Sequence, residues 1–236
     1  MIIIPDVHGR SFWKDAVKND EKVIFLGDYV DPYSEENISS EEAIKILEEI
    51  IDYKKSNPDN TILLLGNHDF MYMDSRHRKI SCRHDYKNED KIEKLFKDNS
   101  DLFQMSYSMD ISGTTYIFSH AGILRDWIDN HTNIFGENTT IPEAAKISND
   151  LYRNWDSKFI RSLLDITVFR GGYNNCASMV WADVRDHFID KNFEEGVYQI
   201  FGHTQVKKSF IRDHYADLDI RKAFMLNEKT GELKEL

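Results

Sequence analysis

Residues 62–70 read ILLLGNHDF, in which four apolar residues run directly into Gly66, Asn67, His68 and Asp69. A turn after a buried strand favours residues such as Gly, Asn or Asp, but it does not need a histidine. The apolar run is short and nearly continuous, which is typical of a strand buried on both faces. The stretch therefore raises the hypothesis of a buried strand that ends in a functional site.

The same pattern occurs four more times along the chain, at the apolar runs 2–4, 23–26, 115–118 and 197–201. Each run leads into a small residue or proline and then into a side chain that can bind metal. In open α/β sheets, sites form beyond the carboxyl ends of strands, so neighbouring parallel strands would bring these groups to one rim. The side chains that follow the five runs are Asp6 and His8, Asp28 and Asp31, Asn67 and His68, His120, and His203.

This mixture of side chains indicates a metal centre. Asp6, Asp28 and Asp31 at one rim would repel one another and raise one another's pKa, so they require a cation. Imidazole, carboxylate and amide oxygen together suit Mn, Fe or Zn better than Ca, and Mn is favoured. The ligands are too many for one tetrahedral ion, which predicts two divalent ions sharing a carboxylate. Such a pair can generate hydroxide and clamp a phosphoryl group.

Helical signals fill the gaps between the strands. Ser39 and Glu42 have capping-box spacing, residues 88–98 form a shorter amphipathic segment, and Thr140 is the expected cap of another helix. A terminal hairpin is expected to turn at residues 229–231. Strand–helix alternation predicts an α/β layered fold, and the length of 236 residues favours a single domain over residues 1–236. Residues 125–195 show weak periodicity, so their topology stays open.

Composition restricts the function classes. The net charge of −11 disfavours a general nucleic-acid binder, and no apolar segment has the length of a membrane span. The two cysteines, Cys82 and Cys176, cannot form a secreted disulfide framework, and small buried side chains are the expected role for both. The apolar start of the chain is too short for a signal peptide. These features predict a cytoplasmic protein without nucleic-acid or membrane partners.

The ordered set DVHG, GDYVD, GNHD, SHAG and GHT resembles the calcineurin-like metallophosphoesterases, and it is most similar to the phosphoprotein phosphatase (Ser/Thr phosphatase) type. The segment MVWADVR, residues 179–185, also resembles the Leu-Trp-Ser-Asp segment of that type. These motifs span residues 6 to 205. The resemblance implies an αββα sandwich of two mixed sheets flanked by helices.

The resemblance also implies a role for each motif residue. His68 is the expected general acid, and Asp31 orients it; an Asp–His pair suits protonation of a leaving oxygen. A metal-bridging hydroxide would attack phosphorus directly, without a covalent phosphoenzyme. Asp28 would bridge the two ions. The implied metal ligands are Asp6, His8, Asp28, Asn67, His120 and His203, and Asn67 would also contact the substrate phosphate.

Two departures from the family pattern affect the substrate site. The family's GDxVD motif usually continues with a phosphate-binding Arg, but here Pro32 follows, and the usual Glu of GNHE is Asp69. Arg170, on a Gly-rich loop, is the expected substitute for the phosphate clamp, with Arg125 and Arg185 as alternatives. A basic stretch at residues 76–84 offers further cations, although a solvated loop is the simpler interpretation of it.

The sequence therefore predicts a metal-dependent phosphoric ester hydrolase that cleaves phosphomonoesters, including those of phosphoproteins as one hypothesis. A nucleotide hydrolase of the dinucleoside polyphosphate type or a phosphodiesterase is the alternative, because the same metals serve all of these reactions. A non-catalytic scaffold that binds metal or phosphate is disfavoured, because every core motif position is present.

Overall fold

The computed structural model describes residues 1–17, 21–78, 80, 83–190 and 193–236. The chain divides into two compact units. The first comprises Met1–Phe103, Arg221–Leu226 and Leu233–Leu236, and the second comprises Gln104–Ile220 and Asn227–Glu232. Whether the two units form one catalytic domain, as the sequence predicts, stays a prediction.

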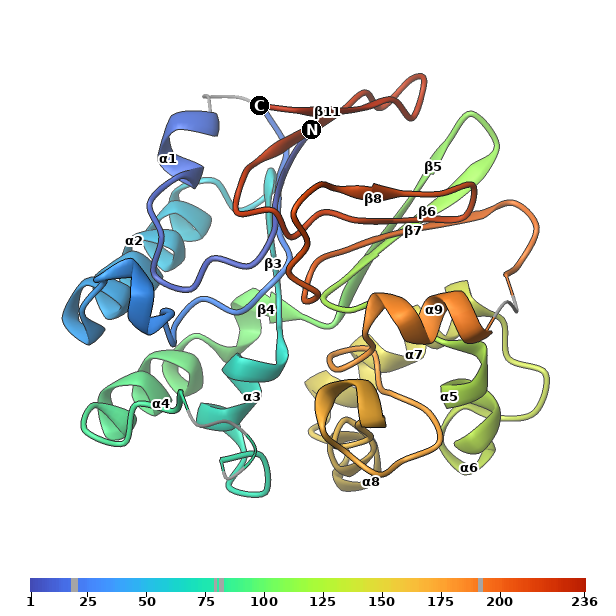
Figure 1. The fold of residues 1–236 in the computed structure, drawn as a ribbon, viewed down its shortest axis with the longest axis horizontal. Helices are drawn as coiled ribbons and strands as arrows, with labels where there is room; N and C mark the ends of the chain where they lie inside the picture. Colours follow the sequence, from blue (N-terminus) through green and yellow to red (C-terminus); the bar gives the residue numbers. More distant parts are fainter. Residues whose placement is uncertain (18–20, 79, 81–82, 191–192) are drawn as a thin grey trace. The chain divides into compact units, whose positions relative to one another are not determined.

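The first unit is built on a six-stranded mixed sheet (Figure 1). Its centre is parallel, because β1 pairs with β2 and β2 pairs with β3 in the same direction. The chain's final hairpin, expected to turn at residues 229–231, turns through 227–232 and adds two antiparallel strands beside β1. In spatial order the strands are β11 (Leu233–Glu235), β10 (Phe224–Leu226), β1 (Ile2–Ile4), β2 (Val23–Phe25), β3 (Thr61–Leu64) and β4 (Phe103–Gln104).

Helix α2 begins where the sequence carries a cap signal. The backbone N–H of Glu42 donates to Ser39 Oγ, and the backbone N–H of Ser39 donates to the Glu42 carboxylate, which completes the predicted capping box. Short 3-10 turns occur at Ser34–Glu36 and Ser100–Leu102. The α-helices are α1 (Trp13–Ala16), α2 (Ser40–Ser56), α3 (Asn67–Met73) and α4 (Glu89–Asp98).

The second unit combines a five-stranded mixed sheet with a group of short helices, which Figure 1 shows gathered beside one another. β6 and β7 are parallel, as are β7 and β9. In spatial order the strands are β5 (Ser106–Ile111), β6 (Thr114–Ser119), β7 (Val197–Phe201), β9 (Tyr215–Asp217) and β8 (Phe210–Ile211). The helices are α5 (Arg125–Asn130), α6 (Thr132–Phe135), α7 (Ile141–Arg153), α8 (Ser157–Ser162) and α9 (Val184–Asp190), with a 3-10 turn at Val168–Arg170.

Two mixed sheets with flanking helices confirm the predicted α/β class. All five apolar runs are strands, but the expectation that they meet at one sheet rim is wrong. β1, β2 and β3 belong to the first sheet, whereas β6 and β7 belong to the second. Within the described parts of the chain, no helix is both long and apolar enough to cross a membrane.

Side-chain packing explains why a glycine occupies position 122 in the SHAG segment, and this explanation can be tested. Gly122 has φ +82°, and a Cβ added there would lie 2.3 Å from His187 Nε2 and 2.9 Å from Phe201 Cδ1. Gly113, in the turn between β5 and β6, has φ +84° with open space around it. An L-residue would have a strained backbone at both positions. Only at Gly122 would its Cβ also overpack the core.

We therefore expect Gly122→Ala to lower the free energy of unfolding by about 1–3 kcal/mol more than Gly113→Ala does. Chemical denaturation of the two variants beside the unmodified protein measures this difference. Equal losses in the two variants would show that the close approach of His187 to Gly122 is relieved at no cost.

Candidate functional site

His8 is held in the form that a metal ligand needs. Its Nδ1 lies 2.8 Å from the carbonyl oxygen of Val30, an acceptor, so Nδ1 carries the proton and donates it. Burial is the main cause that lowers the pKa of His8 well below its ordinary value. The neutral ring therefore turns the Nε2 lone pair toward Asp28, whose Oδ2 lies 3.5 Å away. A ligating histidine fixed by a backbone carbonyl has this arrangement.

The carboxylates beside His8 fit a bound cation. Asp6 and Asp28 are each only 1 % exposed, and Asp6 Oδ2 lies 4.0 Å from His8 Nε2. His68, the expected general acid, lies next to them, because ligand-type atoms of His8, Asp28 and His68 are all within 4.8 Å of one another. Buried carboxylates facing a neutral imidazole are unfavourable unless a positive charge joins them. A divalent transition metal would suit these carboxylate and imidazole donors.

Asp69 ties the second and third motifs together. Its Oδ2 accepts backbone N–H groups from Gly66 at 2.7 Å and from Asp28 at 2.9 Å, and its Oδ1 accepts that of Tyr29 at 3.1 Å. Burial, followed by the charge of Asp28, raises the pKa of Asp69 well above its ordinary value, whereas the three donors act in the opposite direction. The carboxylate therefore fixes the backbone that carries Asp28.

Asp28 in turn accepts the backbone N–H of His68 through Oδ1 at 2.9 Å. Gly27 packs directly against the backbone of Gly66, since a Cβ on Gly27 would lie 2.5 Å from the backbone nitrogen of Gly66. Asn67, the other predicted ligand here, is the first residue of α3 and is buried.

His68 and Asp31 form the pair that the sequence predicts. His68 Nδ1 lies 2.7 Å from Asp31 Oδ2 in a buried environment. Sequence reasoning missed a third member, because the Tyr72 hydroxyl donates to Asp31 Oδ1. Burial and the Asp31 charge raise the pKa of Tyr72, which keeps it a donor. Tyr72 lies four residues after His68 on α3, so helical spacing could have indicated that both side chains share one face.

In the second unit, the structure brings His120 and His203 together. His120 Nε2 lies 3.1 Å from His203 Nδ1, and Trp181 packs edge-on against the His203 ring. The backbone N–H of Gly202 donates to the carbonyl of His120 at 2.8 Å, which joins the SHAG and GHT segments. Ala121 N–H donates to Met179 O at 3.0 Å, so the segment 179–185 belongs to the same assembly. Both predicted histidine ligands of this unit are thus buried and adjacent.

The arginines proposed as phosphate clamps are engaged within the second unit. Arg170 donates from Nη2 to the His203 carbonyl at 2.6 Å, and its Nε lies 3.2 Å from Asp183 Oδ2. Arg185 also binds Asp183, through Nε at 2.7 Å. Burial raises the pKa of Asp183, but these guanidinium partners outweigh it and keep the pKa below its ordinary value. Arg125 forms an ion pair with Glu194. Arg170 therefore lies beside a predicted metal ligand, and Arg125 has a structural role.

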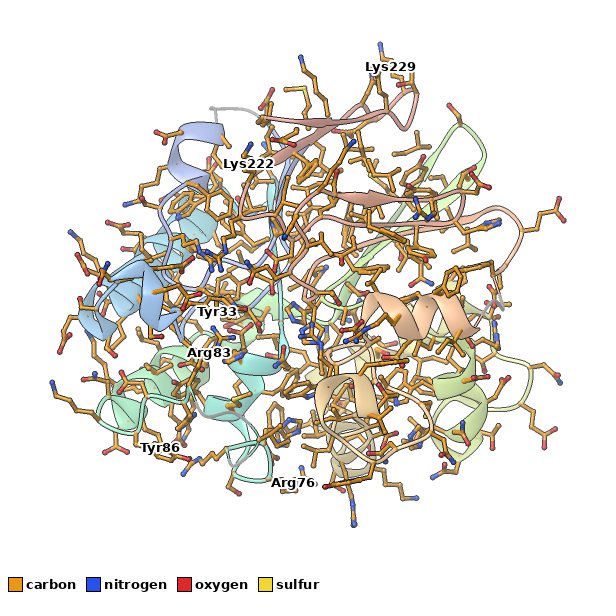
Figure 2. The ribbon with its side chains drawn as sticks, in the orientation of Figure 1. Tyr33, Arg76, Arg83, Tyr86, Lys222 and Lys229 are labelled. Carbon is orange, nitrogen blue, oxygen red and sulfur yellow. The ribbon has the colours of Figure 1, made fainter. Side chains whose placement is uncertain are left out.

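The basic stretch 76–84 contains a residue that the sequence did not single out. Arg76 pairs with Asp74, and Arg78 pairs with Glu89 and Glu93. Arg83 instead reaches the His68–Asp31 pair, and Figure 2 shows it beside Tyr33 while Arg76 lies well away from both. No pattern in the sequence indicates this contact, since it depends on the path of a loop. Cys82 lies outside the described residues, whereas Cys176 is buried and burial raises its thiol pKa to about 12.

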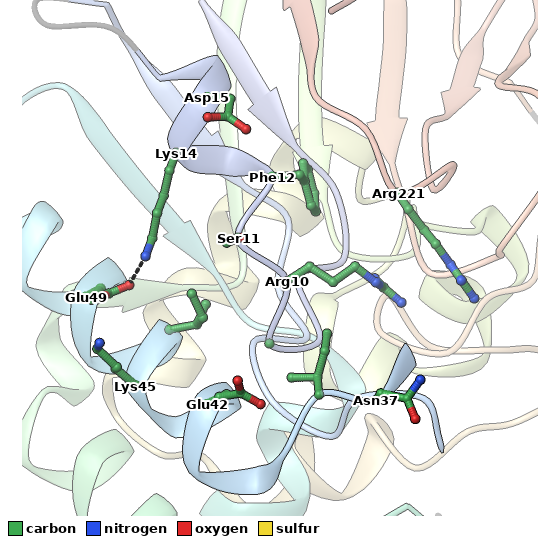
Figure 3. Close-up of a pocket in the computed structure, with 13 residues that line it drawn as sticks. Arg10, Ser11, Phe12, Lys14, Asp15, Asn37, Glu42, Lys45, Glu49 and Arg221 are labelled. Carbon is green, nitrogen blue, oxygen red and sulfur yellow. Dashed lines mark ion pairs between the residues drawn. The ribbon is translucent and has the colours of Figure 1, made fainter. Parts of the chain in front are cut away.

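A separate cavity of about 650 Å³ opens on the first unit next to the DVHG segment (Figure 3). Its described lining includes Gly9 and Arg10 but none of the predicted metal ligands. The side chains of Arg10 and Arg221 reach the same end of this cavity, where both bind Glu36. Lys14 pairs with Glu49 at 2.5 Å across another part of it. Three of the cations that line the cavity are thus paired with carboxylates, and the predicted metal ligands are not part of its described lining.

Four predicted site residues have positive φ although they are not glycine. The left-handed conformation costs an L-residue energy, and such residues concentrate at functional sites. The four are His8 at 44°, Asp28 at 53°, Asp31 at 60° and His203 at 68°.

Residues 2–207 match the family described as calcineurin-like phosphoesterase. The chain belongs to this family. Calcineurin-like phosphoesterases bind divalent metals and act on phosphoesters, which agrees with the buried ligand sets in the two units. No curated protein is similar enough in sequence to count as a match.

Solved structures with the same fold include two phosphatases. One is a cold-active protein-tyrosine phosphatase of a psychrophile, Shewanella sp., with a TM-score of 0.56, 14 % identity, and coverage of 100 % of this chain and 79 % of that one. The other is a protein serine/threonine phosphatase from Saccharomyces cerevisiae, described as similar to human phosphatase PP5. It has a TM-score of 0.56, 15 % identity, and coverage of 100 % and 78 %. At these identities the likeness concerns the calcineurin-like fold alone.

Replacing Asp69 tests the clamp that it forms. In Asp69→Asn, the amide cannot accept all three backbone N–H groups, and its own NH₂ faces donors. Leaving one buried donor unpaired costs about 1–3 kcal/mol, so we expect the free energy of unfolding to fall by that amount. Urea denaturation measures it. Asp98→Asn, the same change at an exposed ion pair with Lys94, is the matched control and should lose less than about 0.5 kcal/mol. Equal stability of the two variants would contradict the clamp.

Proposed function

We propose that the chain is a dinuclear-metal-dependent phosphomonoesterase. The His68–Asp31–Tyr72 arrangement beside the His8–Asp28 pair is the observation that carries this proposal. A buried acid–base pair next to a metal-ligand set is what transfer of a proton to a phosphate leaving group needs. The two units are proposed to act as one catalytic domain over residues 1–236, in the cytoplasm.

The proposed metal ligands come from both units. Asp6, His8, Asp28 and Asn67 belong to the first unit, and His120 and His203 belong to the second. When bound, two divalent ions would polarise the phosphoryl oxygens and supply an activated water. Mn is the favoured ion, with Fe or Zn as alternatives, because imidazole and carboxylate donors occur together. His8, fixed through Val30, and Asp28, fixed through Asp69, support this proposal, since each presents a preset donor.

His68 is proposed to protonate the leaving oxygen from Nε2. Asp31 accepts from Nδ1 and would stabilise the positive charge of the ring as the proton arrives or departs. The Tyr72 hydroxyl occupies the other Asp31 oxygen, which holds the carboxylate in one orientation. In this proposal Asp31 orients His68, and His68 transfers the proton.

The substrate is proposed to be a phosphomonoester, with phosphoproteins as one hypothesis. Hydrolysis of p-nitrophenyl phosphate and of bis(p-nitrophenyl) phosphate, after chelation and Mn add-back, tests this directly. Monoester turnover that returns with Mn supports the phosphomonoesterase. Turnover of only the bis ester would replace it with a phosphodiesterase, and turnover of neither, but of dinucleoside polyphosphates, would point to a nucleotide hydrolase.

His68→Asn should leave the metal content unchanged and reduce turnover by about 10²- to 10⁴-fold, the usual scale for losing a general acid. Metal analysis and steady-state kinetics measure the two quantities. His214→Asn, at an exposed histidine stacked on Phe193, is the matched control and should keep full activity. A full rate in His68→Asn would remove this residue from the mechanism.

Asp28→Asn should lower metal occupancy. The Asn oxygen can still accept the His68 N–H, so the backbone contact survives while the negative charge is lost. Equilibrium dialysis against Mn, followed by metal analysis, is the measurement. Normal occupancy together with full activity would contradict the role of Asp28 as a metal ligand.

A further inference from the structure

Position 32, where the family motif usually continues with an arginine, is occupied by Pro32. The next residue, Tyr33, lies at the centre of a cluster of guanidinium groups in the first unit. The guanidinium carbon of Arg83 lies 3.8 Å from the Tyr33 ring centroid, that of Arg221 lies 5.1 Å away and that of Arg10 lies 5.4 Å away. Positive charge is therefore present next to this motif, although it comes from other parts of the chain.

The three arginines differ in their partners. Arg10 donates from Nε to both Glu36 oxygens, at 2.9 and 3.0 Å, and Arg221 Nη1 lies 2.7 Å from the same carboxylate. Glu36 thus fixes these two cations and offsets their charge. Arg83 instead lies over the Tyr33 ring and reaches the His68–Asp31 pair.

Arg83 contacts the His68–Asp31 pair at two points. Its Nη1 donates to the Asp31 carbonyl oxygen at 2.7 Å, and its Nη2 lies 2.8 Å from His68 Nε2. A guanidinium only donates, so Nε2 accepts here, and Nδ1 carries the proton toward Asp31. Nε2 is also the atom that the proposed mechanism turns toward the leaving oxygen. Any phosphoester oxygen placed there lies within hydrogen-bonding reach of Arg83.

The Tyr33 ring orients Arg83 and links it to the metal ligands. This cation–π contact at 3.8 Å restricts the motion of a long flexible side chain, which reduces the entropy lost when it binds an anion. Tyr33 also contacts His8, whose ring meets it edge-on at a centroid distance of 5.2 Å. One aromatic ring therefore contacts both the guanidinium that reaches His68 and the predicted metal ligand His8.

We propose that Arg83, supported by Tyr33, binds the phosphoryl group of the substrate and takes the role of the arginine that Pro32 replaces. The guanidinium moves from Nε2 onto the phosphoryl oxygens when substrate enters. Nε2, thus uncovered, takes up a proton from solvent and then donates it to the leaving oxygen. A planar donor pair suits a phosphomonoester dianion. This inference rests on the proposed phosphatase function and names a binding residue that the sequence motifs do not contain.

Binding of inorganic phosphate to the Mn-loaded protein tests the inference without any turnover. We expect Arg83→Ala to raise the Kd for phosphate, measured by calorimetry, by about 10- to 100-fold, the range for losing hydrogen bonds to a charged group. KM for p-nitrophenyl phosphate should rise in parallel. Arg83→Lys should recover only part of the affinity, because one ammonium cannot reproduce the planar donor pair.

Arg76→Ala, which removes an exposed arginine of the same loop paired with Asp74, is the matched control and should not change the Kd. Tyr33→Ala, which removes the ring, should bind phosphate at least about threefold more weakly than the unmodified protein, and Tyr33→Phe, which keeps the ring, should bind it more tightly than Tyr33→Ala does. Metal content is measured for every variant.

Three results would overturn the inference. One is a Kd in Arg83→Ala within twofold of the control, another is a loss of phosphate binding that only follows a loss of metal, and the third is no phosphate binding by the unmodified protein. The proposed function is judged separately, by His68→Asn and by Mn-dependent turnover. Full activity in His68→Asn with weakened phosphate binding in Arg83→Ala would therefore remove the general acid and keep Arg83.

Discussion

The first unit's site depends on one carboxylate. Asp69 accepts backbone N–H groups from the ends of two neighbouring strands, so the GDYVD and GNHD segments cannot move independently. This explains why an acidic residue follows His68. The backbone that carries Asp28 is fixed by Asp69, and Asp28 then fixes His68 through the His68 N–H. A metal ligand and a general acid are thus positioned by buried hydrogen bonds, which are stronger in a low-dielectric environment.

Much of this arrangement could be predicted from residue patterns. Continuous apolar runs such as 2–4 and 197–201 are strands with the predicted bounds, because buried parallel strands tolerate few other patterns. Ser39 caps its helix as its spacing to Glu42 predicts, since a capping box depends on residues only three apart, and Thr140 caps α7 as expected. The site residues that follow strands were found by the same logic.

Features that depend on tertiary structure could not be predicted in this way. Sequence patterns do not show which strands share a sheet, so the division of β1–β3 from β6 and β7 was missed. Apart from α7, whose cap at Thr140 was expected, the described helices between residues 125 and 195 span only four to seven residues, which is too short for a clear helical period. Arg83 reaches His68 through a loop, and Arg170, which the sequence favoured as the phosphate clamp, instead bonds to the backbone of His203. A charged side chain's partner is set by the path of the chain, whereas a strand's identity is set by its own residues.

The left-handed backbone at His8, Asp28, Asp31 and His203 sets a limit on how this protein can be improved. Each such residue holds the chain in a conformation that glycine would adopt at lower energy. Substitutions that relax the backbone at these positions would remove a proposed ligand or the partner of the general acid. Selection for thermal stability alone would therefore favour inactive chains. Laboratory evolution of a more thermostable enzyme has to find stabilising substitutions away from these four positions.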